Sequence, residues 1–155
     1  MKVEFQKSAV DCLSPVLREV RTQEQTQEVR LTEGMPDVGR VLASWGQPVL
    51  RSKQWDTDRL SASAGLMVWV LYAPEDGSGV RCVESWVPFQ LSWDLPERTA
   101  DGQMRLRCLN RFVDARAVSG RKIMVRAGMS ALAEALVPMD EVCPPPWGRI
   151  AGNRR

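Results

Sequence analysis

From residue 60 onward, apolar and polar residues alternate in a pattern typical of strands that bury one face. Residues 60–73 differ because they are apolar at almost every position, which predicts a central strand covered on both faces. Residues 74–79 combine proline, aspartate and two glycines, which tolerate the dihedral angles of tight turns. The sequence therefore predicts a hairpin that leads into a returning strand over residues 80–94.

The returning strand has one face predicted to be buried, formed by Val83, Val87, Phe89, Leu91 and Trp93. Pro88 lacks an N–H group, so we expect this strand to be an edge, bulged or split at that residue. A strand over 103–117 is predicted to place Met104, Leu106, Cys108 and Phe112 opposite Arg105, Arg107 and Arg111. A last strand is predicted over 122–137, although residues 129–136 have high helix propensity.

The first 60 residues have a less regular pattern. Short strands are predicted over 28–31 and 48–53, and a short helix is predicted over 37–44, where Pro36 can open the first turn. Residues 14–25 mix helix-compatible and polar residues and predict neither type of element.

These elements predict an all-β, mainly antiparallel domain, a β-sandwich or barrel-like fold with one short helix near 37–44. The predicted organisation is an N-terminal extension over 1–24, a β domain over 25–137 and a C-terminal tail or linker over 138–155.

Composition narrows the class of protein. With 44% hydrophobic and 26% charged residues, the 155-residue chain can form one core. The net charge of +2 is too small for a dedicated nucleic-acid binder. No run of apolar residues is long enough for a membrane span or a signal peptide, so we expect a cytoplasmic protein.

The chain contains no histidine, which removes the commonest general base and the commonest metal ligand. Its cysteines, Cys12, Cys82, Cys108 and Cys143, are widely spaced and form no CxxC pair. We therefore expect free thiols, no metal, no cofactor and no enzymatic activity, although carboxylates, Lys or Tyr can catalyse reactions without histidine.

Six tryptophans are the main candidates for binding, because tryptophan anchors protein interfaces and stacks on sugar rings. Trp69 and Trp93 are predicted to lie in the core. Trp86, on the wetter face of its strand, and Trp147, in the tail, are predicted interface residues.

Arginines provide a second candidate surface. Arg105, Arg107 and Arg111 share one predicted strand face, and Arg116, Arg121 and Arg126 could extend it into a basic stripe for an acidic partner. The alternative is a solvated face that protects a sheet edge from aggregation, and both readings stay open.

Residues 31–38, Leu-Thr-Glu-Gly-Met-Pro-Asp-Val, followed by Val41-Leu42, resemble the Leu-Pro-Glu-Gly-x-Pro-Asp-Ile signature of the DUF3794 (SPOCS) family. The hydrophobic strand that leads into Tyr72 and residues 120–127, Gly-Arg-Lys-Ile-Met-Val-Arg-Ala, match the family in the same order. The resemblance covers about residues 25–137, and Thr32 departs from it where a proline is common.

This resemblance implies a β domain of spore-forming Firmicutes that connects coat components on the mother-cell side of the developing spore. It implies spore-coat or envelope morphogenetic proteins as partners, or self-association, and brings no catalytic residues. The matching residues Glu33, Gly34, Pro36, Asp37, Gly120, Arg121 and Lys122 are then structural.

The residue types within the motif agree with a structural role. Glu33 and Asp37 could be read as paired carboxylates for acid–base or metal chemistry. We prefer an unusual backbone dihedral at Gly34, and a role for Asp37 in capping the short helix or a turn. The expected function is a structural, protein-interaction module in spore coat assembly, and the alternative is a module that binds cell-wall or cortex glycan.

Overall fold

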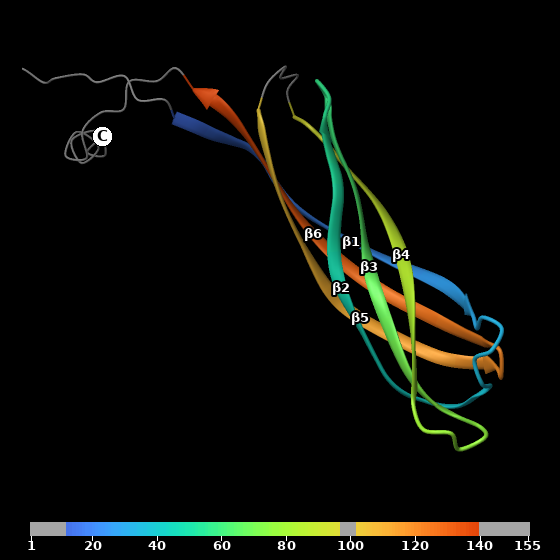
Figure 1. Cartoon of the computed structure of the whole chain (residues 1–155). Coiled ribbons are helices and arrows are strands. Elements are labelled where there is room, and N and C mark those ends of the chain that lie inside the picture. The colour runs from blue at the N-terminus through green and yellow to red at the C-terminus, as the bar shows by residue number, and fades with distance from the viewer. Residues whose placement is uncertain (1–11, 97–101, 140–155) are drawn as a thin grey trace, which may run out of the picture.

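The computed structural model describes residues 12–96 and 102–139, which form an all-β domain (Figure 1). The strands are β1 (Cys12–Arg30), β2 (Val38–Trp55), β3 (Arg59–Pro74), β4 (Arg81–Asp94), β5 (Gln103–Ser119) and β6 (Lys122–Met139). They form two antiparallel three-stranded sheets, in the orders β1-β6-β5 and β2-β3-β4. The prediction of an all-β, mainly antiparallel fold is confirmed.

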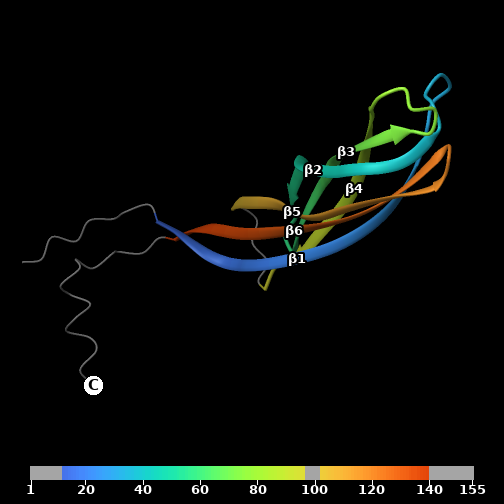
Figure 2. The same ribbon diagram turned by 90° about the horizontal axis from the view of Figure 1, so that it is seen from below.

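The two sheets pack face to face as the layers of a twisted sandwich (Figure 2). Strands β2, β3 and β4 follow one another through hairpins, and β5 and β6 form a third hairpin. The first strand of the chain joins the last one, because β1 pairs with β6 from Cys12 to Arg30. The described ranges contain no helix, and so none that is long and apolar enough to cross a membrane.

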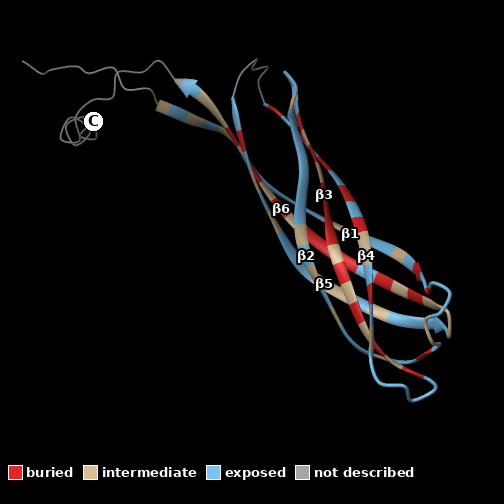
Figure 3. Ribbon diagram, viewed as in Figure 1, coloured by how far each residue is buried: buried red, intermediate tan, exposed pale blue. Residues whose placement is uncertain are grey.

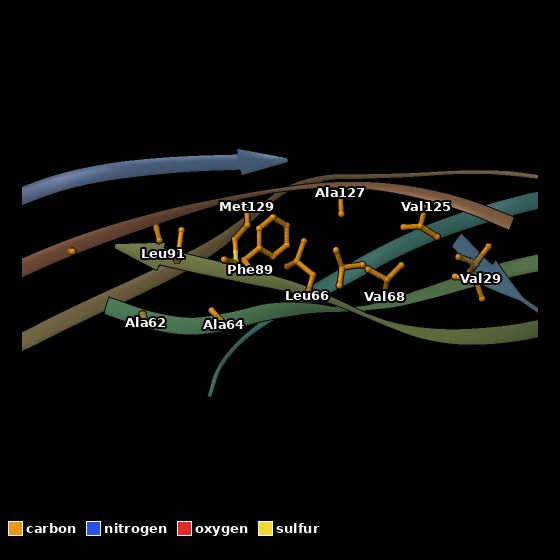
Figure 4. Packing of buried hydrophobic residues seen from close by; sticks show 14 of the residues in the cluster. Val29, Ala62, Ala64, Leu66, Val68, Phe89, Leu91, Val125, Ala127 and Met129 are labelled. Atoms are coloured by element: carbon orange, nitrogen blue, oxygen red, sulfur yellow. The ribbon is translucent and has the colours of Figure 1, made fainter. Parts of the chain in front are cut away.

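The core lies between the sheets and is built mainly on the central strands β3 and β6. Leu66 and Val68 of β3 are fully buried and lie opposite Val125, Ala127 and Met129 of β6 (Figure 4). The predicted inner face of β4 is confirmed, including Trp93, which has no exposed surface. Full burial of a valine, leucine or methionine side chain contributes about 1.5–3 kcal/mol. The central strands β3 and β6 therefore account for much of the stability of the domain.

The helix-favouring residues 129–136 belong to β6, as predicted. Ala131, Ala133 and Ala135 alternate along the strand, and all three are completely buried. Pairing with β1 on one side and β5 on the other satisfies the backbone of β6. These ladders and the buried alanine face outweigh a helix propensity that amounts to tenths of a kcal/mol per residue.

The short helix predicted over 37–44 is wrong, because these residues lie mostly in β2 and pair with β3. Register shifts between Val38 and Arg40 and between Val41 and Ala43 interrupt the strand. Each such irregularity displaces the side-chain alternation, so the apolar residues no longer recur at every second position. The spacing that looked helical is a bulged strand.

The N-terminal extension predicted up to residue 24 does not match the strand boundaries, because β1 begins at Cys12. β1 lies at an edge of its sheet, and much of its length is exposed. Its partner ladder with β6 satisfies the backbone without requiring an apolar face, which is why residues 14–25 carry no strand pattern. The strands predicted over 28–31 and 48–53 are parts of β1 and β2, and β6 continues past residue 137 to Met139.

Candidate interaction surfaces

The residues of the 31–38 and 120–127 segments meet at one end of the sandwich, where the chain crosses from β1 to β2. The Arg121 guanidinium donates hydrogen bonds to the carbonyl oxygen of Met35, to Thr32 O at 2.8 Å and to Asp37 Oδ1 at 3.1 Å. Backbone bonds flank this contact, from Leu31 N to Arg121 O and from Val38 N to Gly120 O, both at 2.9 Å. The Arg121 side chain therefore bonds to three residues of the connection between the sheets.

Two further contacts tie the same connection to β3. The Tyr72 hydroxyl donates to Pro36 O at 2.9 Å, and Glu75 N donates to Asp37 O at 2.9 Å. Gly120 leaves room for Asp37, since a Cβ at Gly120 would lie 3.1 Å from the Asp37 carboxylate. The contact set joins the β1–β2 connection, the β5–β6 turn and the end of β3.

The individual motif residues have different environments. Gly34 has a φ of 92°, a left-handed conformation that glycine adopts without strain. Asp37 caps no helix and instead pairs with Arg121, so the capping role predicted for it at the start of a helix is wrong. Glu33 is exposed, and Lys122 lies 3.6 Å from Glu28. Hydrogen bonding from Arg30 and the positive charge of Lys122 lower the pKa of Glu28.

The outer face of the β2-β3-β4 sheet carries tryptophan, methionine and arginine side chains, and we call it the aromatic face: Trp45, Arg51, Met67, Trp69 and Trp86. Residues on β3 alternate between buried and intermediate exposure (Figure 3). The prediction that both faces of this strand are covered is therefore wrong, because one face is partly open. Trp69 lies on that partly open face, and its predicted position in the core is wrong. The apolar run of β3 serves a core on one side and a surface on the other.

Trp45 and Trp69 form a pair at the centre of this face. They are directly opposed in the β2–β3 register, with ring centroids 6.2 Å apart and ring planes at 19°. Trp45 is 46% exposed. The Trp69 indole N–H donates to Glu84 Oε1 at 3.2 Å, which fixes the ring orientation. The pair is thus held in place and open to solvent.

Trp86 lies next to this pair, opposite Met67 in the β3–β4 register. Its ring covers Gly65, where an added Cβ would lie 2.3 Å from a ring atom. The Arg51 guanidinium lies over the Trp86 ring at 4.1 Å from the ring centroid, a cation–π contact. Trp86 lies on the outer face, as predicted from the alternation of β4.

The outer face of the β1-β6-β5 sheet carries most of the arginines considered above, and we call it the basic face. Arg105 and Arg107 lie on it, as predicted, but a register shift between Asn110 and Phe112 interrupts the strand at Arg111. Phe112 is therefore opposite Gly128 and shares the face of Arg105, not that of Met104.

The remaining arginines do not extend a continuous basic stripe. Arg116 lies 3.5 Å from Asp114. Arg126 pairs with Glu24 at 2.8 Å and stacks over Phe112 at 5.2 Å. The bond to Glu24 raises the pKa of Arg126. Arg121 lies at the β1–β2 connection, and Trp147 lies outside the described residues.

Side chains bridge the edges of the two sheets at four positions within the described residues. Three side chains bridge β2 and β5, from Ser44 Oγ to Val113 O at 3.1 Å, Asn110 Nδ2 to Gly46 O at 3.1 Å and Lys53 Nζ to Met104 O at 2.8 Å. On the other side, Gln23 Nε2 of β1 donates to Gln90 O of β4 at 2.9 Å. Residues 88 and 90 are two positions apart on β4, so their backbone groups point to the same side, away from β3. Pro88 therefore costs the ladder with β3 no hydrogen bond, and β4 is an edge strand, as one of the predicted alternatives had it.

Within residues 12–96 and 102–139, no group of three or more Cys, Asp or Glu side chains is arranged to hold a metal ion. Cys82 and Cys108 are free thiols, and burial raises the pKa of Cys108. The sequence alone did not identify Trp45 as part of the aromatic face or Arg18 as part of the basic face. Their neighbours Trp69 and Arg105 belong to other strands, and only the strand register identifies such pairs.

No family model, no curated protein and no solved structure matches the chain.

Proposed function

We propose that this chain is a non-catalytic protein-interaction module that binds a partner protein through the aromatic face. The observation that carries the proposal is the gathering of Trp45, Trp69, Trp86, Met67 and Arg51 on one side of one sheet. Tryptophan and arginine are the residues most enriched among the energetic anchors of protein interfaces, and methionine is also enriched there.

The fixed geometry of the face supports the proposal. Trp69 is held by Glu84, and Trp86 packs on Gly65 and makes a cation–π contact with Arg51. A partner would meet side chains that already have their bound orientation, so little conformational entropy is lost on binding. Strand addition is less favoured, because side chains bridge the edges of β2 and β5 and Pro88 interrupts the edge of β4.

The resemblance to the DUF3794 (SPOCS) family supports a place for this module in spore coat or envelope assembly, on the mother-cell side of the spore surface. Two of the three segments that carry the resemblance, residues 31–38 and 120–127, contact each other through Arg121, which makes them parts of one structural unit. The proposed partners are coat or envelope morphogenetic proteins, or a second copy of the chain.

Affinity capture from sporulating cells tests this proposal, with wild-type protein, Trp45→Ala and Phe112→Ala as baits. Phe112 is the matched control, because it is an aromatic residue on the outer face of the other sheet. We expect wild type and Phe112→Ala to retain a coat protein and Trp45→Ala to lose it, since a tryptophan anchor is worth about 2 kcal/mol or more. Equal capture by all three baits would refute the role of the aromatic face.

Binding of a cell-wall or cortex glycan is the second candidate, favoured by the Trp45 ring, which is 46% exposed. An exposed tryptophan ring offers an apolar surface for the C–H face of a sugar ring, and the Glu84 carboxylate can accept a bond from a sugar hydroxyl. Titration with soluble glycan fragments, followed by tryptophan fluorescence, should show saturable quenching that Trp45→Ala reduces. An unchanged spectrum would exclude this candidate.

A further inference from the structure

A pocket of about 400 Å³ lies on the basic face, near the start of β1 and the start of β5. Its lining residues are Arg18, Arg105, Leu106, Arg107, Leu132 and Glu134. The strand register explains their proximity, because Arg18, Glu134 and Arg105 lie side by side across β1, β6 and β5. Leu132 and Arg107 occupy the next row.

The pocket has an excess of positive charge. Three arginines line it with a single carboxylate, Glu134, which pairs with Arg18 at 3.4 Å. Arg105 and Arg107 make no ion pair with any carboxylate of residues 12–96 and 102–139. Elsewhere on this face Arg116 and Arg126 each have a carboxylate partner. The uncompensated charge is therefore concentrated at the pocket.

The spacing of the two unpaired arginines is that of an extended chain. Arg105 and Arg107 are two positions apart on β5 and project from the same face, which separates them by about 7 Å along the strand. Alternate side chains of any extended peptide have the same separation. Arginine also binds a carboxylate through two parallel hydrogen bonds, so affinity is highest when each acidic side chain lies directly opposite an arginine.

We infer that this pocket binds an acidic segment of a partner protein in an extended conformation, with carboxylates at alternate positions that pair with Arg105 and Arg107. Leu132 provides an apolar wall for the methylene groups of a glutamate side chain. The pocket lies on the opposite side of the sandwich from the aromatic face, so the inference does not depend on the proposed function of that face.

The carboxylates on the basic face argue against a nucleic acid as the ligand. Glu134 lies in the pocket, and Asp114 and Glu24 continue along the same face. A continuous phosphate backbone would meet these negative charges, whereas a short acidic peptide would engage the two free arginines alone. The chain's net charge of +2 also provides little long-range attraction for a polyanion.

Fluorescence anisotropy with the full chain tests the inference. Two labelled peptides of identical composition would be compared, one with its glutamates at alternate positions and one with the same glutamates adjacent. We expect the alternating peptide to bind more tightly than the peptide with adjacent glutamates, and its affinity to fall as the salt concentration rises. The Arg105→Ala/Arg107→Ala variant should lose at least about tenfold in affinity for it. Both arginines are exposed, so this variant should keep the melting temperature of the wild type.

Two variants serve as controls. Arg116→Ala removes an arginine from the same face of β5 that already pairs with Asp114, and it should leave peptide affinity within about twofold of wild type. Trp45→Ala should also leave it unchanged, which separates this site from the aromatic face. Equal binding of both peptides, or equal losses in Arg116→Ala and the double variant, would overturn the inference. Full displacement of the peptide by equimolar inorganic phosphate, or tighter binding of a single-stranded oligonucleotide, would also overturn it.

Discussion

Replacement of Arg121 by alanine should destabilise the domain, because this side chain connects both sheets through the β1–β2 segment. Its guanidinium bonds to the carbonyls of Thr32 and Met35 and to the carboxylate of Asp37. The Arg121 side chain is 43% exposed and that of Asp37 51% exposed, so their ion pair contributes less than about 1 kcal/mol. The two carbonyl bonds contribute about 1 kcal/mol each after hydration is taken into account.

We therefore expect Arg121→Ala to lower the free energy of unfolding by about 2 kcal/mol, which for a chain of this length lowers the Tm by about 4–8 °C. Urea denaturation of wild type, Arg121→Ala, Asp37→Ala and the double variant provides the measurement. The coupling energy between Arg121 and Asp37 should stay below about 1 kcal/mol, since most of the loss belongs to the carbonyl bonds. Arg121→Lys should recover only part of the stability, because lysine lacks the forked donor geometry.

Two results would refute this reasoning. An Arg121→Ala variant within about 0.5 kcal/mol of wild type would mean that water replaces the guanidinium without cost. A coupling energy equal to the whole effect would mean that the ion pair with Asp37, not the carbonyl bonds, holds the connection.

Three further predictions concern the core and the aromatic face. Gly65→Ala should displace the Trp86 ring, shift tryptophan fluorescence and cost about 1–3 kcal/mol, because an added Cβ would lie 2.3 Å from that ring; a spectrum and urea midpoint equal to wild type would contradict it. Ala131→Leu should cost a similar amount of about 1–3 kcal/mol, since Ala131 has no exposed surface and a larger side chain would separate the sheets; an unchanged midpoint would argue against close packing there. Burial raises the pKa of Tyr72 above the ordinary tyrosine value of 10.0, so the folded state retains the phenol proton that the unfolded state releases. Stability should therefore fall as pH rises above 10.0. Tyr72 is the only tyrosine, so ultraviolet absorbance reports its titration alone, and urea midpoints of Tyr72→Phe should lose this alkaline dependence; ionisation at the ordinary tyrosine pKa would contradict the prediction.

Strands β4, β5 and β6 could be predicted from the alternation of apolar and polar residues, and β3 from its apolar run. In β4, Val87, Phe89, Leu91 and Trp93 are at most 2% exposed, as the alternation predicted. Such a pattern lies within one strand, so it can be recognised without knowing which strands are its neighbours. The boundaries were accurate to within about two residues where a turn signal followed, as at 74–79 and 120.

The predictions failed where neighbouring strands, and not the alternation, specify the structure. The residues of β1 are mostly polar, and β1 forms a strand because its backbone pairs with that of β6. In β2, bulges interrupt the alternation of apolar and polar residues. Trp69 was predicted to be buried because both faces of β3 are apolar, but only one sheet covers that strand. Alternation alone does not indicate which face a second layer will cover.

The sequence by itself determined an antiparallel β domain, the buried rows of its central strands and the left-handed glycine of the 31–38 segment. Only the tertiary structure decided the proximity of Trp45 to Trp69, of Arg18 to Arg105 and of Arg121 to Asp37. Each of these pairs joins strands or connections far apart in the chain. Cross-strand neighbours depend on sheet order and register, which are set by backbone ladders and bulges that the side chains of a single strand do not encode.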